Sequence, residues 1–551
     1  MISPGKLSCV PDPASVSGKE PPIADATDLL VIGAGAAGMS AALVAAGRGA
    51  QVTLVDENPI PPSSMGEEVP LHFGGRMAAT VASRNAVTES ILEANPALGE
   101  ALDAGVDVRL GTAAWGLFPR RPTARWLSGH VAGLADAQRA YLLRFKQVIV
   151  AAGRRDMGLA FGGWQLPGVM GATAAYRLAV TYRALEARTA VLLGGGPEAL
   201  RIAESLLEAG VRVAAVVEQA QTLAGSAQSL ARLTGSGTRV YTRHVIEQAT
   251  GDVHGVTAVR IVPVDGQGRR SGGRAETIEC DTVLLGVAAI PAIELIEAGG
   301  CAVGFQAARG GHVPLVDSAQ RTSLPFVYAA GDCAGIWPSK SLCEATARGE
   351  GAIAARAALA ALGIAQEGPP EETPVPEAPA RDVALERLAW VRATLQQHSG
   401  PGAPVLCQCE EVTFADILSL HPPRYVERPP SGGRVGSSGL GALGGAAPDP
   451  DAVKRLTRAG MGACQGRRCR EQIAALLALA SGSPLEQIPL ARYRPPVRPL
   501  RLAQMGSLAE APAMAEHWES WFGIASQWLP YWRIPPGRTA DDRTDEPVAG
   551  E

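Results

Sequence analysis

The sequence predicts an α/β protein with two dinucleotide-binding domains and a small helical domain that carries cysteines. An apolar strand, a glycine-rich turn, a helix and a second strand follow one another within residues 26–58. The same order recurs within residues 188–219. Two pairs of closely spaced cysteines, each followed by a helix-like segment, come later in the chain. Strands that alternate with helices are typical of a parallel sheet covered by helices.

Composition and charge exclude several classes of protein. The chain has 551 residues, of which 46% are hydrophobic and 19% are charged, as in ordinary globular proteins. Its net charge of −4 lacks the basic excess of a nucleic-acid-binding protein, so we expect no nucleic-acid partner. We see neither a secretion signal nor an unbroken apolar run long enough to span a membrane. Nine cysteines without a secretion signal indicate a reducing compartment, so we expect a cytoplasmic protein.

The first strand–helix unit carries the pattern G-x-G-x-x-G directly after a buried strand. In this pattern the first glycine makes the turn and the second lets a diphosphate approach the backbone. The third glycine lets the helix pack closely against the strand. The acid that ends the next strand, 23 positions after the first glycine, can accept a hydrogen bond from a ribose hydroxyl. The candidate binding residues of this unit are Gly33, Gly35, Ala36, Ala37, Gly38, Asp56 and Glu57.

The second unit has Gly194, Gly196 and Ala199 at the same three positions. Glu218 ends the strand that follows. A carboxylate there suits an unphosphorylated ribose and repels a 2′-phosphate, which favours NAD or another adenine nucleotide over NADP. The alternative is a degenerate unit that is kept only as a scaffold.

The order of the later motifs resembles that of flavoproteins of the glutathione-reductase type. One apolar strand ends in Ala152-Gly153, a second lies within 281–291, and a third ends in Gly331-Asp332. The resemblance implies an FAD domain that is interrupted by a second nucleotide-binding domain. It also implies that Asp332 binds the FAD ribityl or phosphate region.

The cysteines near these motifs do not look like those of a disulfide reductase. No reactive pair follows the first acidic residue, and the second unit has no Cys-x-x-Cys. We expect Cys333 and Cys343 to be packed thiols. A dithiol reductase is therefore disfavoured.

The two C-terminal pairs are Cys407 with Cys409 and Cys464 with Cys469. A helix is expected after each pair, so helix N-termini would direct amides towards four thiolates. Zinc and [2Fe–2S] both accept four thiolates, and the spacing does not decide between them. A flavin in the same chain favours the redox cluster.

Two further patterns accompany the cysteines. Thr413 and Asp416 form a capping-box pattern, which predicts the start of a helix. Arg467 and Arg468 stand between the second pair and could offset the charge of a cluster. Our default expectation for these two arginines is a solvated charged face.

CQCEEV at 407–412 and KRLTRAGMGACQGRRC at 454–469 resemble the bacterioferritin-associated-ferredoxin-like [2Fe–2S] module. The resemblance is to its version in opine oxidase A subunits, hydroxyproline dehydrogenase α subunits and hydrogen cyanide synthase B subunits. GWQLPGVMGATAA at 163–175 and the segment 491–510 are also similar to that group. The resemblance covers about residues 26–510 and implies a list of four cluster ligands: Cys407, Cys409, Cys464 and Cys469.

One motif departs from this group. Its usual Pro-Gly-Gly-Gln after the first ribose acid is missing, and only Gly74-Gly75-Arg76 is left, displaced by several residues. Gly75 and Arg76 remain candidate FAD residues.

The resemblance implies an electron-transfer subunit that contains FAD and [2Fe–2S]. Its partner would be a D-amino-acid-oxidase-like flavoprotein that oxidises the C–N bond of an amino acid or N-substituted amino acid, such as an opine or hydroxyproline. A small ferredoxin-like subunit is a further partner in this interpretation, and any association with a membrane would be through an electron acceptor. Three alternatives stay open: glycine oxidation of the hydrogen cyanide synthase type, a self-sufficient NADH-dependent reductase, and a non-catalytic assembly subunit. The scattered histidines suggest no catalytic residue.

The expected organisation has six parts, one of which is formed by two separate stretches of the chain. They are a flexible tail at 1–25, an FAD-binding domain at 26–165 and 281–365, a second nucleotide-binding domain at 166–280, a linker at 366–400, a [2Fe–2S] domain at 401–482 with a glycine-rich insertion at 429–450, and a C-terminal extension at 483–551.

Overall fold

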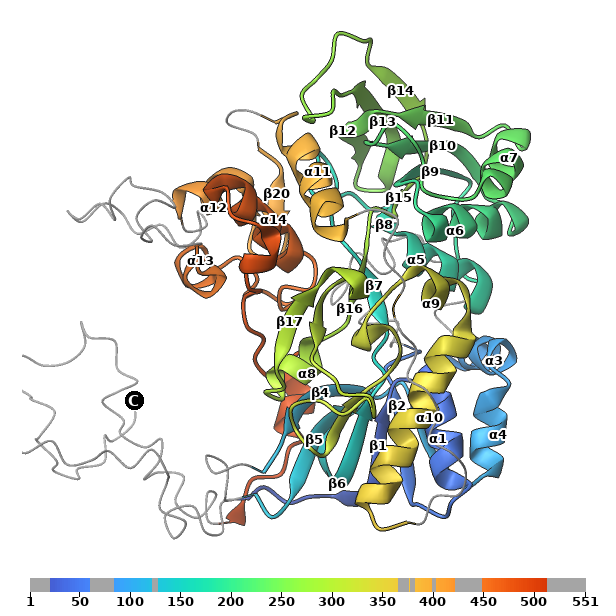
Figure 1. The fold of residues 1–551 in the computed structure, drawn as a ribbon, viewed down its shortest axis with the longest axis vertical. Helices are drawn as coiled ribbons and strands as arrows, with labels where there is room; N and C mark the ends of the chain where they lie inside the picture. The colour runs from blue at the N-terminus through green and yellow to red at the C-terminus, as the bar shows by residue number, and fades with distance from the viewer. Residues whose placement is uncertain are drawn as a thin grey trace, which may run out of the picture.

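The computed structural model describes residues 20–59, 84–120, 127–364, 376, 382–398, 403–421 and 448–512. The candidate residues Gly75 and Arg76, and most of the glycine-rich insertion, lie outside these ranges. Figure 1 shows two sheet-containing bodies one above the other, with the orange helices of the C-terminal part beside them.

The first sheet has seven strands, in the order β3-β2-β1-β6-β5-β4, with β19 paired to β6. The strands are β1 Asp25–Ile32, β2 Val52–Asp56, β3 Asp107–Leu110, β4 Ala113–Phe118, β5 His130–Ala135, β6 Ala140–Val150 and β19 Val327–Ala329. β1, β2, β3, β6 and β19 pair in parallel, so their carboxyl ends lie at one edge. Helices α1 Ala36–Ala46, α3 Arg84–Ala94, α4 Ala97–Asp103 and α10 Glu344–Ala361 belong to this body.

The second sheet has five parallel strands in the order β11-β10-β9-β15-β8. They are β8 Val169–Gly171, β9 Thr189–Leu193, β10 Arg212–Glu218, β11 Arg239–Thr242 and β15 Thr282–Leu285. An antiparallel sheet of β12 His244–Asp252, β13 Gly255–Pro263 and β14 Glu276–Glu279 packs beside it. The helices are α5 Ala172–Tyr176, its π-helical continuation Arg177–Thr181, α6 Pro197–Glu208 and α7 Ala227–Gly235.

The chain returns from the second body to the first later than we expected. We placed residues 281–365 in the first domain, but β15 pairs along its whole length with β9 of the second sheet. The chain returns only at β16 Ala289–Pro291, which pairs with β7 Arg154–Asp156. Sequence pattern could not distinguish these sheets, because an apolar parallel strand looks the same in either one.

Several short elements connect β16 to β19 and α10. They are α8 Glu294–Ala298, β17 Val303–Gln306, the 3₁₀ turn Ala307–Arg309, β18 Gly311–Pro314, the 3₁₀ turn Gly331–Ala334 and α9 Pro338–Leu342. The second 3₁₀ turn begins two residues after the end of β19, at the carboxyl edge of the first sheet.

The described residues between 382 and 488 form six regular elements and a 3₁₀ turn. They are α11 Val383–Leu395, β20 Val405–Cys407, β21 Val412–Thr413, α12 Phe414–Ser419, α13 Pro450–Thr457, α14 Arg470–Ser481 and the 3₁₀ turn Leu485–Gln487. α11 lies inside the expected linker, so that part of the prediction is wrong. The helix forms because Asp382 caps it and its Trp390, which is 1% exposed, reaches the shared core.

The last described segment packs back on the first sheet. The Val497 N–H donates to the Trp115 carbonyl at 2.8 Å, and Arg498 forms an ion pair with Glu57. α15 Leu502–Gly506 then lies next to the β5–β6 turn, where the Gln504 side chain donates to the Asp136 carbonyl. None of the described helices has both the length and the apolar character of a membrane-spanning segment.

Candidate functional site

The first glycine loop has the geometry that its pattern predicts. A Cβ on Gly33 would lie 2.2 Å from the Ala151 carbonyl oxygen, and a Cβ on Gly38 would lie 1.8 Å from that of Gly33. These two glycines therefore let strand and helix touch. Gly35 differs, because a Cβ there would meet no protein atom within 4 Å and its φ of −75° suits any residue. Space beside Gly35 is open to a ligand.

Asp56, the acid at the end of β2, holds this loop in place. Its carboxylate accepts from the Ala34 N–H at 2.7 Å and from the Asn58 N–H at 2.8 Å. Asp56 also lines the cavity described next. Glu57 is not among the described lining residues and pairs with Arg498 instead.

A cavity of about 800 Å³ opens at the carboxyl edge of the first sheet. This is within the usual size range for cofactor sites. The predicted residues that line it are Gly35, Ala36, Ala37, Asp56, Gly153, Gly331 and Asp332. Gly33 and Gly38 lie beneath the loop, and Ala152 is absent from the described lining.

A buried ion pair that the sequence did not reveal positions the Gly331-Asp332 turn. The Gly331 N–H donates to the Glu350 carboxylate at 2.8 Å, and its carbonyl accepts from Lys340 Nζ at 2.8 Å. Lys340 and Glu350 bind one another at 2.6 Å, and both side chains are fully buried. Gly331 needs its φ of +75°, and a Cβ there would crowd the Ala37 side chain at 3.0 Å. No sequence motif predicts this ion pair.

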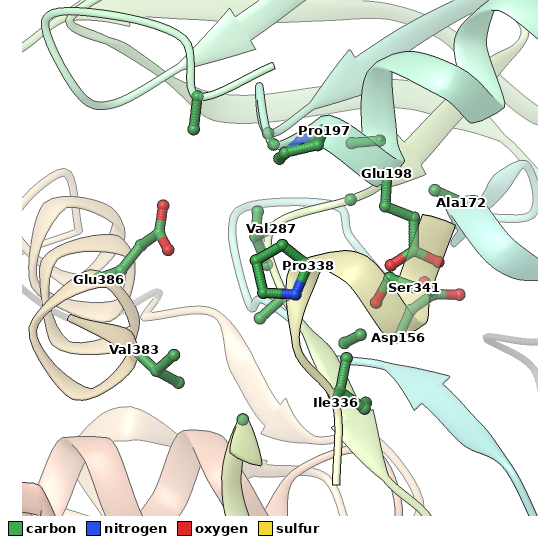
Figure 2. A pocket seen from close by; sticks show the side chains of 18 of the residues that line it. Asp156, Ala172, Pro197, Glu198, Val287, Ile336, Pro338, Ser341, Val383 and Glu386 are labelled. Carbon is green, nitrogen blue, oxygen red and sulfur yellow. The ribbon is translucent and has the colours of Figure 1, made fainter. Parts of the chain in front are cut away.

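Arg154 links the first cavity to the second glycine loop. Its guanidinium lies 3.3 Å from the Asp332 carboxylate and donates to the Ser341 hydroxyl at 3.2 Å. It also forms an ion pair with Glu198, in the first turn of α6. Burial raises the pKa of Glu198 to about 7, and Arg154 partly offsets this effect. Figure 2 shows Glu198 and Ser341 facing one another, with Asp156 close by.

The second loop opens on a smaller cavity of about 220 Å³, lined by Gly194, Gly196, Ala199 and Glu218. The Glu218 carboxylate is 1% exposed and accepts from the Gly195 N–H at 2.8 Å. Figure 2 shows side chains of α6, α9 and α11 around this space, among them Pro197, Pro338 and Val383.

Three features of the second loop oppose a diphosphate. Pro197 begins α6 and provides no N–H, and Glu198 places a carboxylate in the first turn. The Leu223 side chain packs against the loop, because a Cβ added to Gly195 would lie 2.1 Å from the Leu223 Cδ2 atom.

The structure brings the four C-terminal cysteines together in two pairs. Cys407 lies within hydrogen-bonding range of Cys469, and Cys409 within that of Cys464. Cys407, Cys464 and Cys469 are at most 2% exposed, whereas Cys409 reaches the surface. Within the described ranges, no three His, Cys, Asp or Glu side chains are spaced to hold a single metal ion.

Glycines let the backbone close around these thiols. The Gly460 N–H donates to Cys407 Sγ at 3.3 Å, and a Cβ on Gly462 would lie 2.3 Å from the Cys409 Cβ. The predicted helix after the second pair is confirmed as α14, for which Cys469 is the N-cap. The capping box of Thr413 and Asp416 is confirmed at the start of α12.

The expectation that Arg467 and Arg468 form a solvated face is wrong. They are 5% and 4% exposed, because the cysteine loop packs against the first body through β7. Sequence reasoning could not see this contact, which joins segments more than 300 residues apart.

Strand β7 contacts three parts of the molecule with three successive side chains. Arg154 lines the large cavity, as described above. Arg155 is buried, donates to the Arg467 carbonyl at 2.9 Å and pairs with Glu471 of α14. Asp156 accepts from the Thr173 N–H at 3.0 Å, at the start of α5. The cysteine loop and the large cavity are therefore joined through two adjacent residues.

The sequence profile of the pyridine nucleotide-disulphide oxidoreductases matches residues 27–358, more than half of the chain. The chain belongs to this family. A second profile, of the sarcosine oxidase A3 domain, matches residues 448–509.

Curated relatives of this pyridine nucleotide-disulphide oxidoreductase cover nearly the whole chain. The A subunit of opine oxidase from Agrobacterium tumefaciens (strain Ach5) is 29% identical, over 88% of this chain and 92% of its own length. The hydrogen cyanide synthase subunit HcnB of Pseudomonas aeruginosa is 26% identical, over 80% of this chain and 90% of its own. The crystal structure of L-proline dehydrogenase from P. horikoshii shares the fold, with a TM-score of 0.56 and 19% identity over 89% of this chain and 81% of that one.

These findings confirm the glutathione-reductase-type fold and identify the chain as an FAD-dependent oxidoreductase. One expectation about its thiols needs correction. Cys333 is fully buried, as expected, but Cys343 is exposed and lines the large cavity. Cys343 is the single residue, in extended conformation, between α9 and α10.

Replacement of Gly35 with alanine tests the large cavity directly. We expect Gly35→Ala to leave the thermal unfolding of the flavin-free protein unchanged, because the added methyl group meets no protein atom. FAD affinity should fall about tenfold or more, since the diphosphate must then move away from the backbone. Flavin content and FAD titration measure this. Gly196→Ala, at the equivalent position of the second loop, is the matched control and should retain FAD; an unchanged affinity in Gly35→Ala would contradict the assignment.

Proposed function

We propose that this chain is the electron-transfer subunit of a heteromeric dehydrogenase that oxidises the C–N bond of an amino acid or N-substituted amino acid. In this proposal FAD occupies the large cavity and a [2Fe–2S] cluster is bound by Cys407, Cys409, Cys464 and Cys469. The observation that carries the proposal is the meeting of these four thiols beside β7, whose residue Arg154 lines the cavity.

The residues around the cavity fit FAD. The amides at the start of α1 would bind the diphosphate at the helix N-terminus. In this proposal Asp56 would accept from a ribose hydroxyl, and Asp332, which Arg154 binds, would bind the ribityl chain; both line the cavity. No histidine is among the described residues that line this cavity. In this proposal the substrate is deprotonated in a partner of the D-amino-acid-oxidase type.

The four thiols fit a binuclear cluster better than zinc. Two pairs of thiols would supply two sulfurs to each of two irons, whereas structural zinc takes four ligands at one tetrahedral centre. Arg467 and Arg468 also have buried guanidinium nitrogens that lack hydrogen-bond partners. An anionic group nearby would stabilise these nitrogens. Bound FAD would accept electrons in pairs, and the cluster would pass them on singly.

The names of the relatives support the substrate class. Opine oxidase and hydrogen cyanide synthase are both named as having subunits. Glycine and N-substituted amino acids remain the two substrate classes to compare, with a flavoprotein partner and, as a further component, a small ferredoxin-like subunit.

Anaerobic titration of the purified chain with NADH tests the proposal. We expect bound FAD and stoichiometric iron and sulfide, with a flavin that NADH does not bleach, because Pro197, Glu198 and Leu223 oppose a diphosphate at the second loop. Dithionite should reduce both centres and give the electron paramagnetic resonance signal of a reduced cluster. Rapid bleaching by NADH would instead identify a self-sufficient reductase. Purified protein without flavin or iron would identify an assembly subunit.

A further inference from the structure

Four buried arginines surround the cysteine loop, and two of them have carboxylate partners. Arg155 pairs with Glu294 and with Glu471. Arg470 pairs with Glu297 at 2.5 Å. Each of these two cations is therefore neutralised by the protein itself.

Arg467 and Arg468 have no such partner, since neither forms an ion pair with a carboxylate in the described ranges. Arg467 Nε donates to the Cys464 carbonyl at 2.9 Å, while its two terminal nitrogens are buried without hydrogen bonds. The Arg468 guanidinium lies over the Trp164 ring, 4.9 Å from its centre, and its Nε is also buried without a partner. A buried cation without a counter-charge is strongly unfavourable, so both arginines require an anion at this place.

The cysteines are the available anion. Arg467 and Arg468 stand between Cys464 and Cys469 in the chain, and Arg467 binds the Cys464 carbonyl, so both belong to the loop that carries two of the four thiols. A [2Fe–2S] core bound by four thiolates carries a double negative charge when oxidised and gains one more on reduction. Two guanidinium groups match the oxidised charge, and their field favours the added electron.

We propose that Arg467 and Arg468 are the counter-cations of the four-cysteine centre and that their charge raises its reduction potential. The inference rests on the proposed function, in which the centre is a [2Fe–2S] cluster. The reduced flavin would give its two electrons to the cluster one at a time, the cluster would pass each to an external one-electron acceptor before it takes the next, and the flavin protons would go to solvent. No bond to the protein forms or breaks. The arginines thereby make the cluster a better electron acceptor for the flavin.

Two variants of the full-length protein test this charge effect. In Arg468→Gln we expect unchanged iron and sulfide content and an equilibrium constant for cluster reduction at least tenfold lower, or about 59 mV for a one-electron couple. Arg468→Lys retains the charge and should recover most of this potential. Arg455→Gln is the matched control, because this arginine of α13 is 61% exposed and its charge is screened by solvent. Its potential should be that of the wild type in a titration followed by electron paramagnetic resonance.

The outcomes separate this inference from the proposed function. Wild-type protein without iron and sulfide overturns both. A wild-type cluster together with an unshifted potential in Arg468→Gln overturns the counter-cation role alone. If Arg468→Gln assembles no cluster, Arg468→Lys decides: a full cluster supports the need for charge, and an empty one shows that only the shape of arginine matters.

Discussion

Gly38→Ala is expected to abolish FAD retention by the purified chain. The added Cβ would lie 1.8 Å from the Gly33 carbonyl oxygen and 3.3 Å from the Ala151 side chain, so α1 must move off the sheet. Overpacking of this kind costs about 1–3 kcal/mol in stability. It also displaces the helix N-terminus that would bind the diphosphate. Flavin absorbance after purification and thermal unfolding measure the two effects.

Gly99→Ala is the control for this substitution. Gly99 lies in α4 of the same body, and a Cβ there meets no atom within 4 Å. This variant should retain FAD and be as stable as the wild type or slightly more so, because alanine is the better helix former by about 1 kcal/mol. Full FAD retention by Gly38→Ala would show that α1 does not need its close approach to the strand.

Arg155→Met is expected to give the largest loss of stability. Arg155 pairs with both Glu294 and Glu471, and their side chains are 10% and 6% exposed. Its removal takes from two buried carboxylates the cation that binds them directly, and breaking a buried pair in this way costs about 3–5 kcal/mol. The cysteine domain also loses its hydrogen bond from Arg155 to the Arg467 carbonyl. Chemical unfolding, together with limited proteolysis, would measure the weakened attachment of this domain.

Two comparisons separate the cause from a general effect of losing an arginine. Arg232→Met removes a cation that is 53% exposed and paired with Glu208, so it should cost at most about 1 kcal/mol. Combining Arg155→Met with Glu294→Gln and Glu471→Gln removes the unpaired charges and should restore much of the stability. If Arg155→Met unfolds with the same free energy as the wild type, this network does not hold the domains together.

Local patterns were sufficient for the two glycine loops. The helix after Gly35 and the strand that ends at Asp56 are where the sequence predicts them. The capping box at Thr413 is also present as predicted. Each of these features depends on residues close together in the chain, whose backbone conformation and spacing already determine the turn or helix.

Other features depend on contacts between distant segments. The sheet that β15 joins, and the path that exposes Cys343, follow from strand pairing and chain direction. Lys340 and Glu350 have no sequence signature, because an ion pair ten residues apart is recognisable only after both side chains are buried together.

The sequence by itself determined the fold class, the two dinucleotide-type loops and the choice of four cysteines as one candidate centre. Only the tertiary structure decided which thiols pair and that Arg467 and Arg468 are buried beside them. It also directed Arg154 towards the large cavity and Arg155 towards the cysteine loop. The physical reason is that burial and charge pairing are properties of a packed neighbourhood, to which segments hundreds of residues apart contribute together.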